Sequence, residues 1–194
     1  RRHTPEHRRG LSRRAVLGAA MMFATAPAMA ADHPSIAYMK QFAKEMLNAH
    51  RQGTVGSFRK VIERHADVAA IADYSLGQYR KKLPAGQKQK YYGGVVTFMS
   101  RYFADQSRIY PIAKYEIGDA AADDGEVVIN SKVYLLSGQS YTVVWRLSKN
   151  GSRYKVRDAK VLGFSMVYMQ RGLFTSFISK RNGDVEQLVA ALTR

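Results

Sequence analysis

Residues 154–192 read YKVRDAKVLGFSMVYMQRGLFTSFISKRNGDVEQLVAAL, and this stretch decides the fold. From Tyr154 to Val161 apolar and polar side chains broadly alternate, which predicts a half-buried strand. A tight Gly-Phe-Ser turn, Gly163 to Ser165, follows the strand. We therefore expect the chain to leave a sheet at this turn and to end in helices.

Two helices are predicted after the turn. Apolar side chains fall at helical spacing, so they share one stripe of the first helix; they are Leu173, Phe174, Phe177 and Ile178. Gly183 fits a left-handed end to this helix. Asp184 with Gln187 has the form of a capping box and opens the terminal helix, whose apolar face holds Val185, Leu188, Val189 and Leu192.

Upstream of this stretch the pattern is helical first and sheet-forming second. Helices are predicted over residues 36–47, 57–63 and 67–80, and a longer one begins at Pro84 and runs through Phe103. Gly53 and Gly56 are expected to break the first helix, while Gly93-Gly94 in the long helix indicates a bend or a close approach by another element. Strands are predicted over residues 112–117, 126–136, 140–148 and 153–162.

Short turn-rich links separate these strands, which favours an antiparallel meander. The sequence thus predicts an α+β fold in which N-terminal helices pack on a curved four-stranded antiparallel sheet followed by C-terminal helices. Residues 31–194 are enough for one domain with a sizeable core.

The N-terminal segment has the pattern of an export signal. Arg13-Arg14 lies within SRRAVLG, a mild apolar run follows, and Ala28-Met29-Ala30 resembles a cleavage site. We therefore expect residues 1–30 to be a twin-arginine export signal that is removed after Ala30. The alternative is an uncleaved N-terminal anchor, but the run is shorter than the ~20 residues of a spanning helix.

The composition limits the classes of protein further. The chain has no cysteine, which excludes a disulfide framework and an acylated cysteine. Removing the six arginines and one glutamate of residues 1–30 leaves 25 basic and 14 acidic residues, a formal net charge of +11. Export argues against a nucleic-acid partner. Clustered basic residues indicate either solvated helix faces or contact with anionic lipid headgroups or acidic partners; they are Lys81, Lys82, Lys88, Lys90, Lys180 and Arg181.

Three short motifs resemble those of the MlaC family, the toluene-tolerance or ABC-transporter auxiliary proteins. The C-terminal motif comprises Tyr154, Val156, Asp158, Gly163, Phe164, Ser165, Arg171 and Phe174. The upstream motifs are Leu76, Gly77 and Tyr79, and Pro84, Gln87, Lys88 and Tyr91. The resemblance covers roughly residues 31–194.

This resemblance implies a nuclear-transport-factor-2-like cone and a soluble periplasmic carrier of phospholipid, which supports the lipid asymmetry of the outer membrane. The implied partners are phospholipid, an inner-membrane ABC complex with an MCE-domain protein and an outer-membrane lipid-extracting complex, with only peripheral membrane contact. No cofactor and no enzymatic activity are implied, because the bound phospholipid is cargo.

Large apolar side chains are candidates for lining a lipid cavity between the sheet and the long helix. The candidate residues are Val95, Phe98, Tyr102, Val127, Ile129, Val143, Trp145, Val161, Phe164, Met166, Phe174 and Ile178. Without the resemblance, these residues would be interpreted as ordinary core. The sequence also leaves open a carrier for another lipid such as a hopanoid, a basic adaptor protein, and a cone-fold enzyme with a small hydrophobic substrate.

Catalytic and metal-binding patterns are weak. Gly163 to Val167 has the first half of a nucleophile elbow but lacks its closing glycine. His33, His50 and His65 lie far apart and without ligand spacing, so no metal site is expected. Asp158 is expected to accept hydrogen bonds from the Gly163 to Ser165 turn and to hold strand and turn together.

Overall fold

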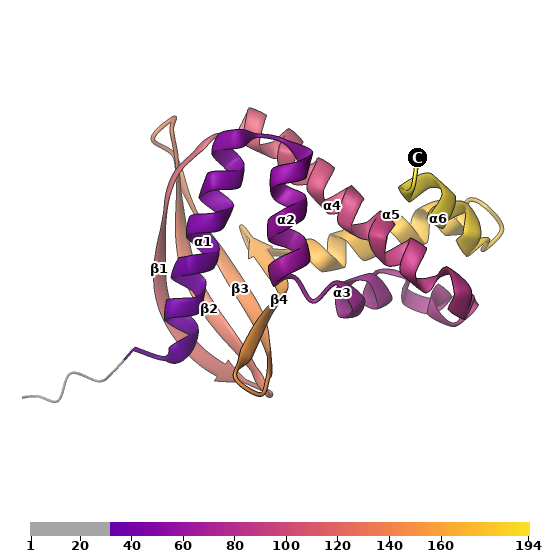
Figure 1. The fold of residues 1–194 in the computed structure, drawn as a ribbon, viewed down its shortest axis with the longest axis horizontal. Helices are drawn as coiled ribbons and strands as arrows, with labels where there is room; N and C mark the ends of the chain where they lie inside the picture. Colours follow the sequence, from indigo (N-terminus) through magenta and orange to yellow (C-terminus); the bar gives the residue numbers. More distant parts are fainter. Residues whose placement is uncertain (1–31) are drawn as a thin grey trace, which may run out of the picture. The chain divides into compact units, whose positions relative to one another are not determined.

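Six α-helices and five strands make up the part of the chain that the computed structural model describes, residues 32–194 (Figure 1). The helices are α1 Pro34–Gln52, α2 Val55–His65, α3 Val68–Ser75, α4 Lys88–Ile109, α5 Met166–Ser179 and α6 Val185–Leu192. The strands are β1 Ile112–Asp123, β2 Glu126–Leu135, β3 Ser140–Asn150, β4 Arg153–Val161 and β5 Phe164–Ser165. The proposed export signal, residues 1–30, lies outside the described residues.

The sheet is an antiparallel meander in the order β1-β2-β3-β4-β5. The α+β class and the antiparallel sheet are confirmed, but the prediction of four strands was wrong. Residues Phe164 and Ser165, which were assigned to a turn, pair with Val161 and Lys160 as a short fifth strand. The turn itself is only Leu162-Gly163, because both residues take the positive φ values that a two-residue hairpin loop requires.

Strand β4 contains a bulge that changes which side chains face inward. Arg146 of β3 pairs with Asp158 and Leu147 pairs with Val156, so Arg157 is an extra residue on β4. Before the bulge Tyr154 and Val156 point into the core, and after it Ala159 and Val161 take that side. The broad alternation seen in the sequence is therefore two alternating segments with a shift between them.

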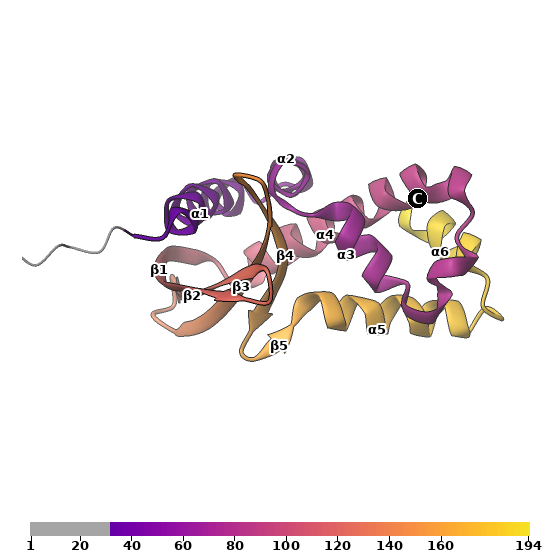
Figure 2. The ribbon, with the colours of Figure 1, turned by 90° about the horizontal axis from the view of Figure 1, so that it is seen from below.

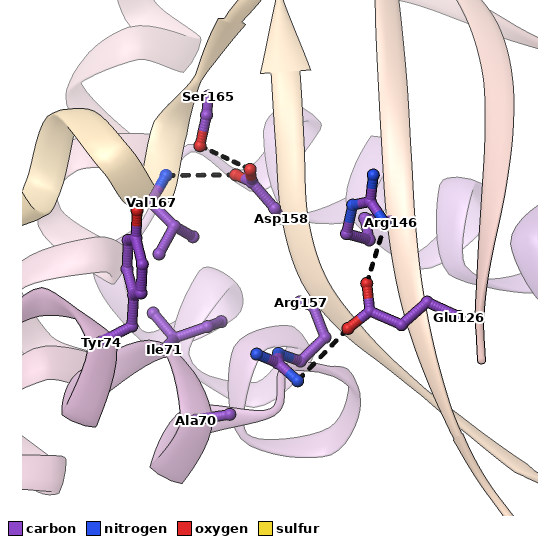
Figure 3. Close-up of a pocket in the computed structure, with 9 residues that line it drawn as sticks. All are labelled: Ala70, Ile71, Tyr74, Glu126, Arg146, Arg157, Asp158, Ser165 and Val167. Atoms are coloured by element: carbon purple, nitrogen blue, oxygen red, sulfur yellow. Dashed lines mark hydrogen bonds and ion pairs between the residues drawn. The ribbon is translucent and has the colours of Figure 1, made fainter. Parts of the chain in front are cut away.

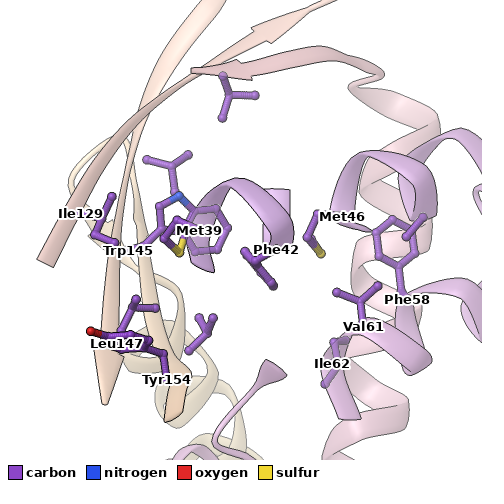
Figure 4. Packing of buried hydrophobic residues seen from close by; sticks show 14 of the residues in the cluster. Met39, Phe42, Met46, Phe58, Val61, Ile62, Ile129, Trp145, Leu147 and Tyr154 are labelled. Carbon is purple, nitrogen blue, oxygen red and sulfur yellow. The ribbon is translucent and has the colours of Figure 1, made fainter. Parts of the chain in front are cut away.

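Helices α1 and α2 pack on the inner face of the sheet and form its core. Met39 and Phe42 of α1 lie toward Ile129, Trp145 and Leu147 of the sheet, whereas Met46 lies toward Phe58, Val61 and Ile62 of α2 (Figure 4). The Trp145 indole N–H donates to the Ser131 hydroxyl at 2.8 Å, and that hydroxyl donates to the Val143 carbonyl at 2.8 Å, so these buried polar groups are paired. The buried hydroxyl of Tyr154 in the same core has no hydrogen-bond partner among the described residues.

A second core joins the remaining helices away from the sheet (Figure 2). It is formed by buried residues of α3, α4, α5 and α6 together with the segment between α3 and α4; they are Ala72, Leu76, Leu83, Tyr91, Val95, Phe174, Ile178, Val185, Leu188, Val189 and Leu192. Gly94 of α4 allows α6 to approach closely, since a Cβ there would lie 2.8 Å from the Leu192 Cβ. The expected close approach at Gly93-Gly94 is thus confirmed for Gly94.

Several helix ends agree with the sequence and several do not. Gly53 ends α1 with positive φ, while Asp67 and Asp184 cap α3 and α6. Gly183 does not end α5 as expected, because the helix stops at Ser179 with Lys180 as its C-cap and Gly183 takes its positive φ in the following turn. Gly56, however, lies inside α2 rather than between helices.

The helix expected over residues 67–80 is also interrupted. It stops at Ser75, and a 3₁₀ segment, Gly77–Lys82, follows because Gly77 takes a left-handed φ of 53°. Pro84 precedes a second 3₁₀ turn, Ala85–Gln87, so α4 begins four residues later than predicted, at Lys88.

Candidate functional site

A cavity of about 260 Å³ lies between the inner face of the sheet and helices α1, α2, α4 and α5. For comparison, an apolar cavity of about 150 Å³ is enough to bind benzene. The principal lining side chains are apolar; from the helices they are Phe42, Met46, Val61, Ile62, Phe98, Met99, Tyr102, Phe103, Met166, Met169 and Leu173. From the sheet they are Ile112, Tyr115, Val133, Tyr141, Val143, Trp145, Val156, Ala159 and Val161.

The cavity opens to solvent along one rim. Tyr102, Tyr110, Met169 and Leu173 line the cavity and are exposed, with Leu173 at 61%. Exposed apolar side chains at a cavity are typical of a site that binds an apolar ligand. The rim is thus the entrance through which such a ligand would pass.

The lining carries few charges near neutral pH. Burial raises the pKa of Tyr115 and of Tyr141, and it lowers the pKa of His50 to about 4, so these three groups stay neutral. Arg157, the extra residue of the β4 bulge, and the adjacent Asp158 are the charged residues of the wall. Such a lining favours hydrocarbon over a charged ligand group.

Asp158 is held in a structural role, as expected. Its carboxylate accepts hydrogen bonds from the Ser165 hydroxyl and from the Val167 N–H, the latter at 3.1 Å. The Ser165 hydroxyl oxygen in turn accepts from the Tyr168 N–H and caps α5. This chain of bonds ties β4 to the start of α5 at the edge of the cavity.

The Nδ1 atom of His50 is buried and has no hydrogen-bond partner. Within residues 32–194, no hydrogen bond joins this imidazole to a carboxylate, and Asp158 of the same cavity bonds instead to Ser165 and Val167. In the same residues no cluster of potential metal ligands is found.

A smaller polar pocket of about 180 Å³ lies next to the cavity, and the two share Ile71, Arg157, Asp158 and Val167 (Figure 3). Three of its charged side chains form ion pairs, whereas Asp158 bonds to Ser165 and Val167. Glu126 accepts from Arg146 at 3.0 Å and lies 3.3 Å from Arg157. Arg146 also donates to Asp123 at 3.0 Å. We interpret this network as a clamp across the strands, because its charges already satisfy each other.

The structure divides the twelve predicted lipid-binding residues into two groups of six. The cavity is lined by Phe98, Tyr102, Val143, Trp145, Val161 and Met166. The others lie elsewhere: Val127 and Ile129 in the core under α1, Val95, Phe174 and Ile178 in the helical core, and Phe164 at the surface with 68% exposure.

Sequence reasoning missed several lining residues. Tyr141 shares a strand face with Val143 and Trp145, so the two-residue period was a signal for it. Met169 was not singled out, and Leu173 was placed on the buried stripe of its helix although it lies exposed at the rim. No local pattern distinguishes a rim residue from a buried one on the same short helix.

Comparison with known proteins agrees with this architecture. The family model for the MlaC protein matches residues 36–194. The chain belongs to the MlaC family. The resemblance seen in the three motifs is therefore confirmed.

One solved structure extends the comparison to the fold. The chain is similar to a phospholipid-binding protein from Ralstonia solanacearum, solved in complex with a phospholipid, with a TM-score of 0.65 at 24% sequence identity. The match covers 84% of this chain and 95% of that chain. At this identity the likeness shows a shared fold. No curated protein matches the chain significantly.

Proposed function

We propose that this chain is a periplasmic carrier that holds the acyl chains of a phospholipid in its apolar cavity. The observation that carries the proposal is an apolar cavity with an exposed apolar rim in a member of the MlaC family. The phospholipid-bound relative from Ralstonia solanacearum supports the choice of cargo. A cone-shaped nuclear-transport-factor-2-like arrangement around the cavity is part of the same proposal.

The energetics of the cargo determine how such a carrier would work. Burying ~30 methylenes at about 0.8 kcal/mol each gives roughly 24 kcal/mol relative to water. Release into water is therefore negligible, whereas exchange with another apolar site is close to balanced. A carrier of this kind performs no chemistry, and its proposed partners set the direction: an inner-membrane ABC complex with an MCE-domain protein and an outer-membrane lipid-extracting complex.

Export to the periplasm is part of the proposal. In residues 32–194, no helix combines the length and apolar character needed to cross a bilayer. We infer that residues 1–30 are a twin-arginine export signal and that residues 31–194 form the lipid-binding domain. Intact-mass measurement of the periplasmic protein is expected to show a chain that begins at Ala31, and a chain that retains Arg13 and Arg14 would contradict the cleavage.

Native mass spectrometry of protein purified from its own periplasm tests the cargo. We expect a bound mass equal to one diacyl lipid, followed by its identification after extraction. A ligand-free mass would contradict the proposal. A polycyclic lipid without phosphate in the extract would instead support a hopanoid carrier.

A matched pair of substitutions tests the location of the cargo. Ala159 faces the cavity on β4, whereas Ala121 is an exposed residue of β1. Ala159→Phe places a ring in the space for the acyl chains, so we expect it to lower the lipid-bound fraction severalfold. Ala121→Phe should leave that fraction unchanged. Equal lipid content in the two variants would show that the cargo lies elsewhere.

A further inference from the structure

The turn between β4 and β5 contains a residue that its backbone does not favour. Leu162 and Gly163 are the two loop residues, with φ values of 52° and 84°. Positive φ at both positions is the requirement of a type I′ turn, in which Asn-Gly and Asp-Gly are preferred. A leucine is strained there because its Cβ approaches the backbone carbonyl.

The other non-glycine positions with positive φ hold residue types that tolerate this conformation. Among residues 32–194, the non-glycine residues with positive φ are Asp124, Leu162 and Asn182, and each precedes a glycine. Aspartate and asparagine tolerate this conformation. Leu162 is the apolar exception, and it is 68% exposed, so burial does not offset the strain. The requirements of folding do not explain why a leucine stands here.

The neighbourhood of Leu162 is also apolar and exposed. We define the mouth patch as five side chains that are each at least 51% exposed: Leu162, Phe164, Tyr168, Met169 and Leu173. Figure 2 shows the β4–β5 turn and the first turns of α5 side by side. Met169 and Leu173 also line the cavity, so the mouth patch is continuous with its rim. Contiguous exposed apolar side chains indicate an interaction surface.

We propose that the mouth patch docks the carrier on an anionic phospholipid bilayer, with Leu162 and Phe164 entering the interface. This inference rests on the proposed function, because a carrier that exchanges its cargo at membrane complexes brings its rim close to the bilayer around them. The described part of the chain has a formal net charge of +11, which attracts an anionic surface. The patch has no acidic side chain, and exposed Lys160 lies two residues before Leu162.

Two other occupants of the patch are less consistent with these observations. A second copy of the chain would bring the same strong positive charge against itself, which opposes self-association. A protein partner would be expected to meet fixed polar groups as well as apolar ones. Aromatic and aliphatic side chains beside lysine instead suit a bilayer interface.

Vesicle flotation with the purified protein tests the proposal. Vesicles of phosphatidylcholine mixed with phosphatidylglycerol should bind the protein, pure phosphatidylcholine vesicles should bind it more weakly, and salt should reduce the difference. Leu162→Asn should weaken binding about tenfold, because one leucine side chain no longer enters the interface. The same change should raise the thermal midpoint, since asparagine suits the turn. The expected result is therefore a higher thermal midpoint together with weaker vesicle binding.

Asp124→Leu is the matched control. Asp124-Gly125 connects β1 to β2 with nearly the same φ values, 49° and 77°, and lies at the opposite end of the sheet because the strands alternate in direction. This variant should lower the thermal midpoint and leave vesicle binding unchanged. Equal binding by Leu162→Asn and the parent protein, or no binding to anionic vesicles by the parent, would overturn the proposal.

Two further measurements separate this proposal from its alternatives. Lipid content from native mass spectrometry should be the same in Leu162→Asn and the parent, because the substitution lies outside the cavity. Parallel loss of lipid and of vesicle binding would show that Leu162 serves the cavity and would overturn docking. Concentration-dependent dimers that Leu162→Asn abolishes, without vesicle binding, would assign the patch to self-association and would also overturn it.

Discussion

The sheet half of the described unit contains a cavity beside its core, whereas the helical half buries the corresponding stripe of α4, although the same kinds of side chains build both. In the helical half, α4 packs against α3 and α6, and Tyr91, Val95 and Ile178 are fully buried. In the sheet half, the cavity lies where α4 faces the strands. Near the sheet α2 packs against α4, with Phe58 stacked on Phe103, yet the cavity remains beside Phe98 and Tyr102. The difference therefore lies in how completely the neighbouring elements cover α4.

Helix α4 passes through both regions along one stripe. Tyr91 and Val95 belong to the packed core, while Phe98 and Tyr102, the next positions of the same stripe, line the cavity. Phe98 also meets Phe174 edge to face at 5.1 Å between ring centroids, which marks the boundary between the two regions. Residue type does not change along the stripe, so a binding cavity here depends on the neighbours of the helix.

Two neighbouring residues of α5 should show the largest difference between the two regions in how much a substitution by alanine lowers the free energy of unfolding. Phe174 is 2% exposed in the packed core, whereas Leu173 is 61% exposed at the rim of the cavity. Phe174→Ala is expected to lower the free energy of unfolding by about 3–5 kcal/mol. Leu173→Ala should change it by less than about 0.5 kcal/mol. Urea unfolding followed by circular dichroism measures both.

Similar losses in the two α5 variants would mean that the rim is packed in solution. In that case the distinction between the two halves would be wrong. A small loss for both variants would indicate instead that the helical core adjusts to fill the space left by Phe174.

Acid should weaken the region around the cavity through His50. Burial lowers the pKa of His50 to about 4, so the folded protein resists protonation while the unfolded chain binds a proton near the ordinary pKa of about 6.5. Stability is therefore complete above pH 6.5 and declines as the pH falls toward 4. Between pH 7 and pH 5 we expect a loss of roughly 1–2 kcal/mol from this residue.

His50→Gln supplies the control for the pH experiment. Glutamine does not titrate, so the loss between pH 7 and pH 5 should be smaller in the variant than in the parent by that amount. Other groups are the same in both proteins. For example, burial raises the pKa of Glu45, but its hydrogen bonds to Gln41 and His65 lower that pKa overall. Identical pH dependence in parent and variant would show that the imidazole is hydrated in solution.

Local features of the fold were predictable because each depends on a few neighbouring residues. The caps at Asp67 and Asp184 and the helix end at Gly53 follow from side-chain oxygens and from the conformational freedom of glycine. The hydrogen bond that Asp158 accepts from the Ser165 hydroxyl was likewise expected, whereas the one from the Val167 N–H was not. Each of these interactions is complete within a short segment.

Membership of the cavity wall could be predicted only in part, because it depends on long-range packing. Val143 and Trp145 were found by strand period and line the cavity, whereas Ile129, which also faces inward, is covered by α1. Val95 and Phe98 share one helix stripe but face different neighbours. Pattern reasoning identifies an apolar face, and only the tertiary arrangement shows which part of that face is left uncovered.

Adjacent glycines of α4 provide the most sensitive comparison between a filled and an open environment. A Cβ at Gly94 would lie 2.8 Å from the Leu192 Cβ, whereas nothing lies within 4 Å of one at Gly93. Both positions are inside a helix, where alanine is preferred over glycine by up to about 1 kcal/mol. Gly93→Ala should therefore stabilise the protein by about 0.5–1 kcal/mol. Gly94→Ala should destabilise it by about 1 kcal/mol, since overpacking costs about 1–3 kcal/mol and exceeds the helical gain.

Opposite signs in this pair, measured by urea unfolding, would show that α6 packs tightly on α4 in solution. Stabilisation by both substitutions would mean that α6 moves away without cost. The helical half would then be able to open like the sheet half, and a continuous space along α4 would become available to long acyl chains. The sign of the Gly94→Ala effect therefore decides whether the cavity ends at Phe98 and Phe174 or can extend beyond them.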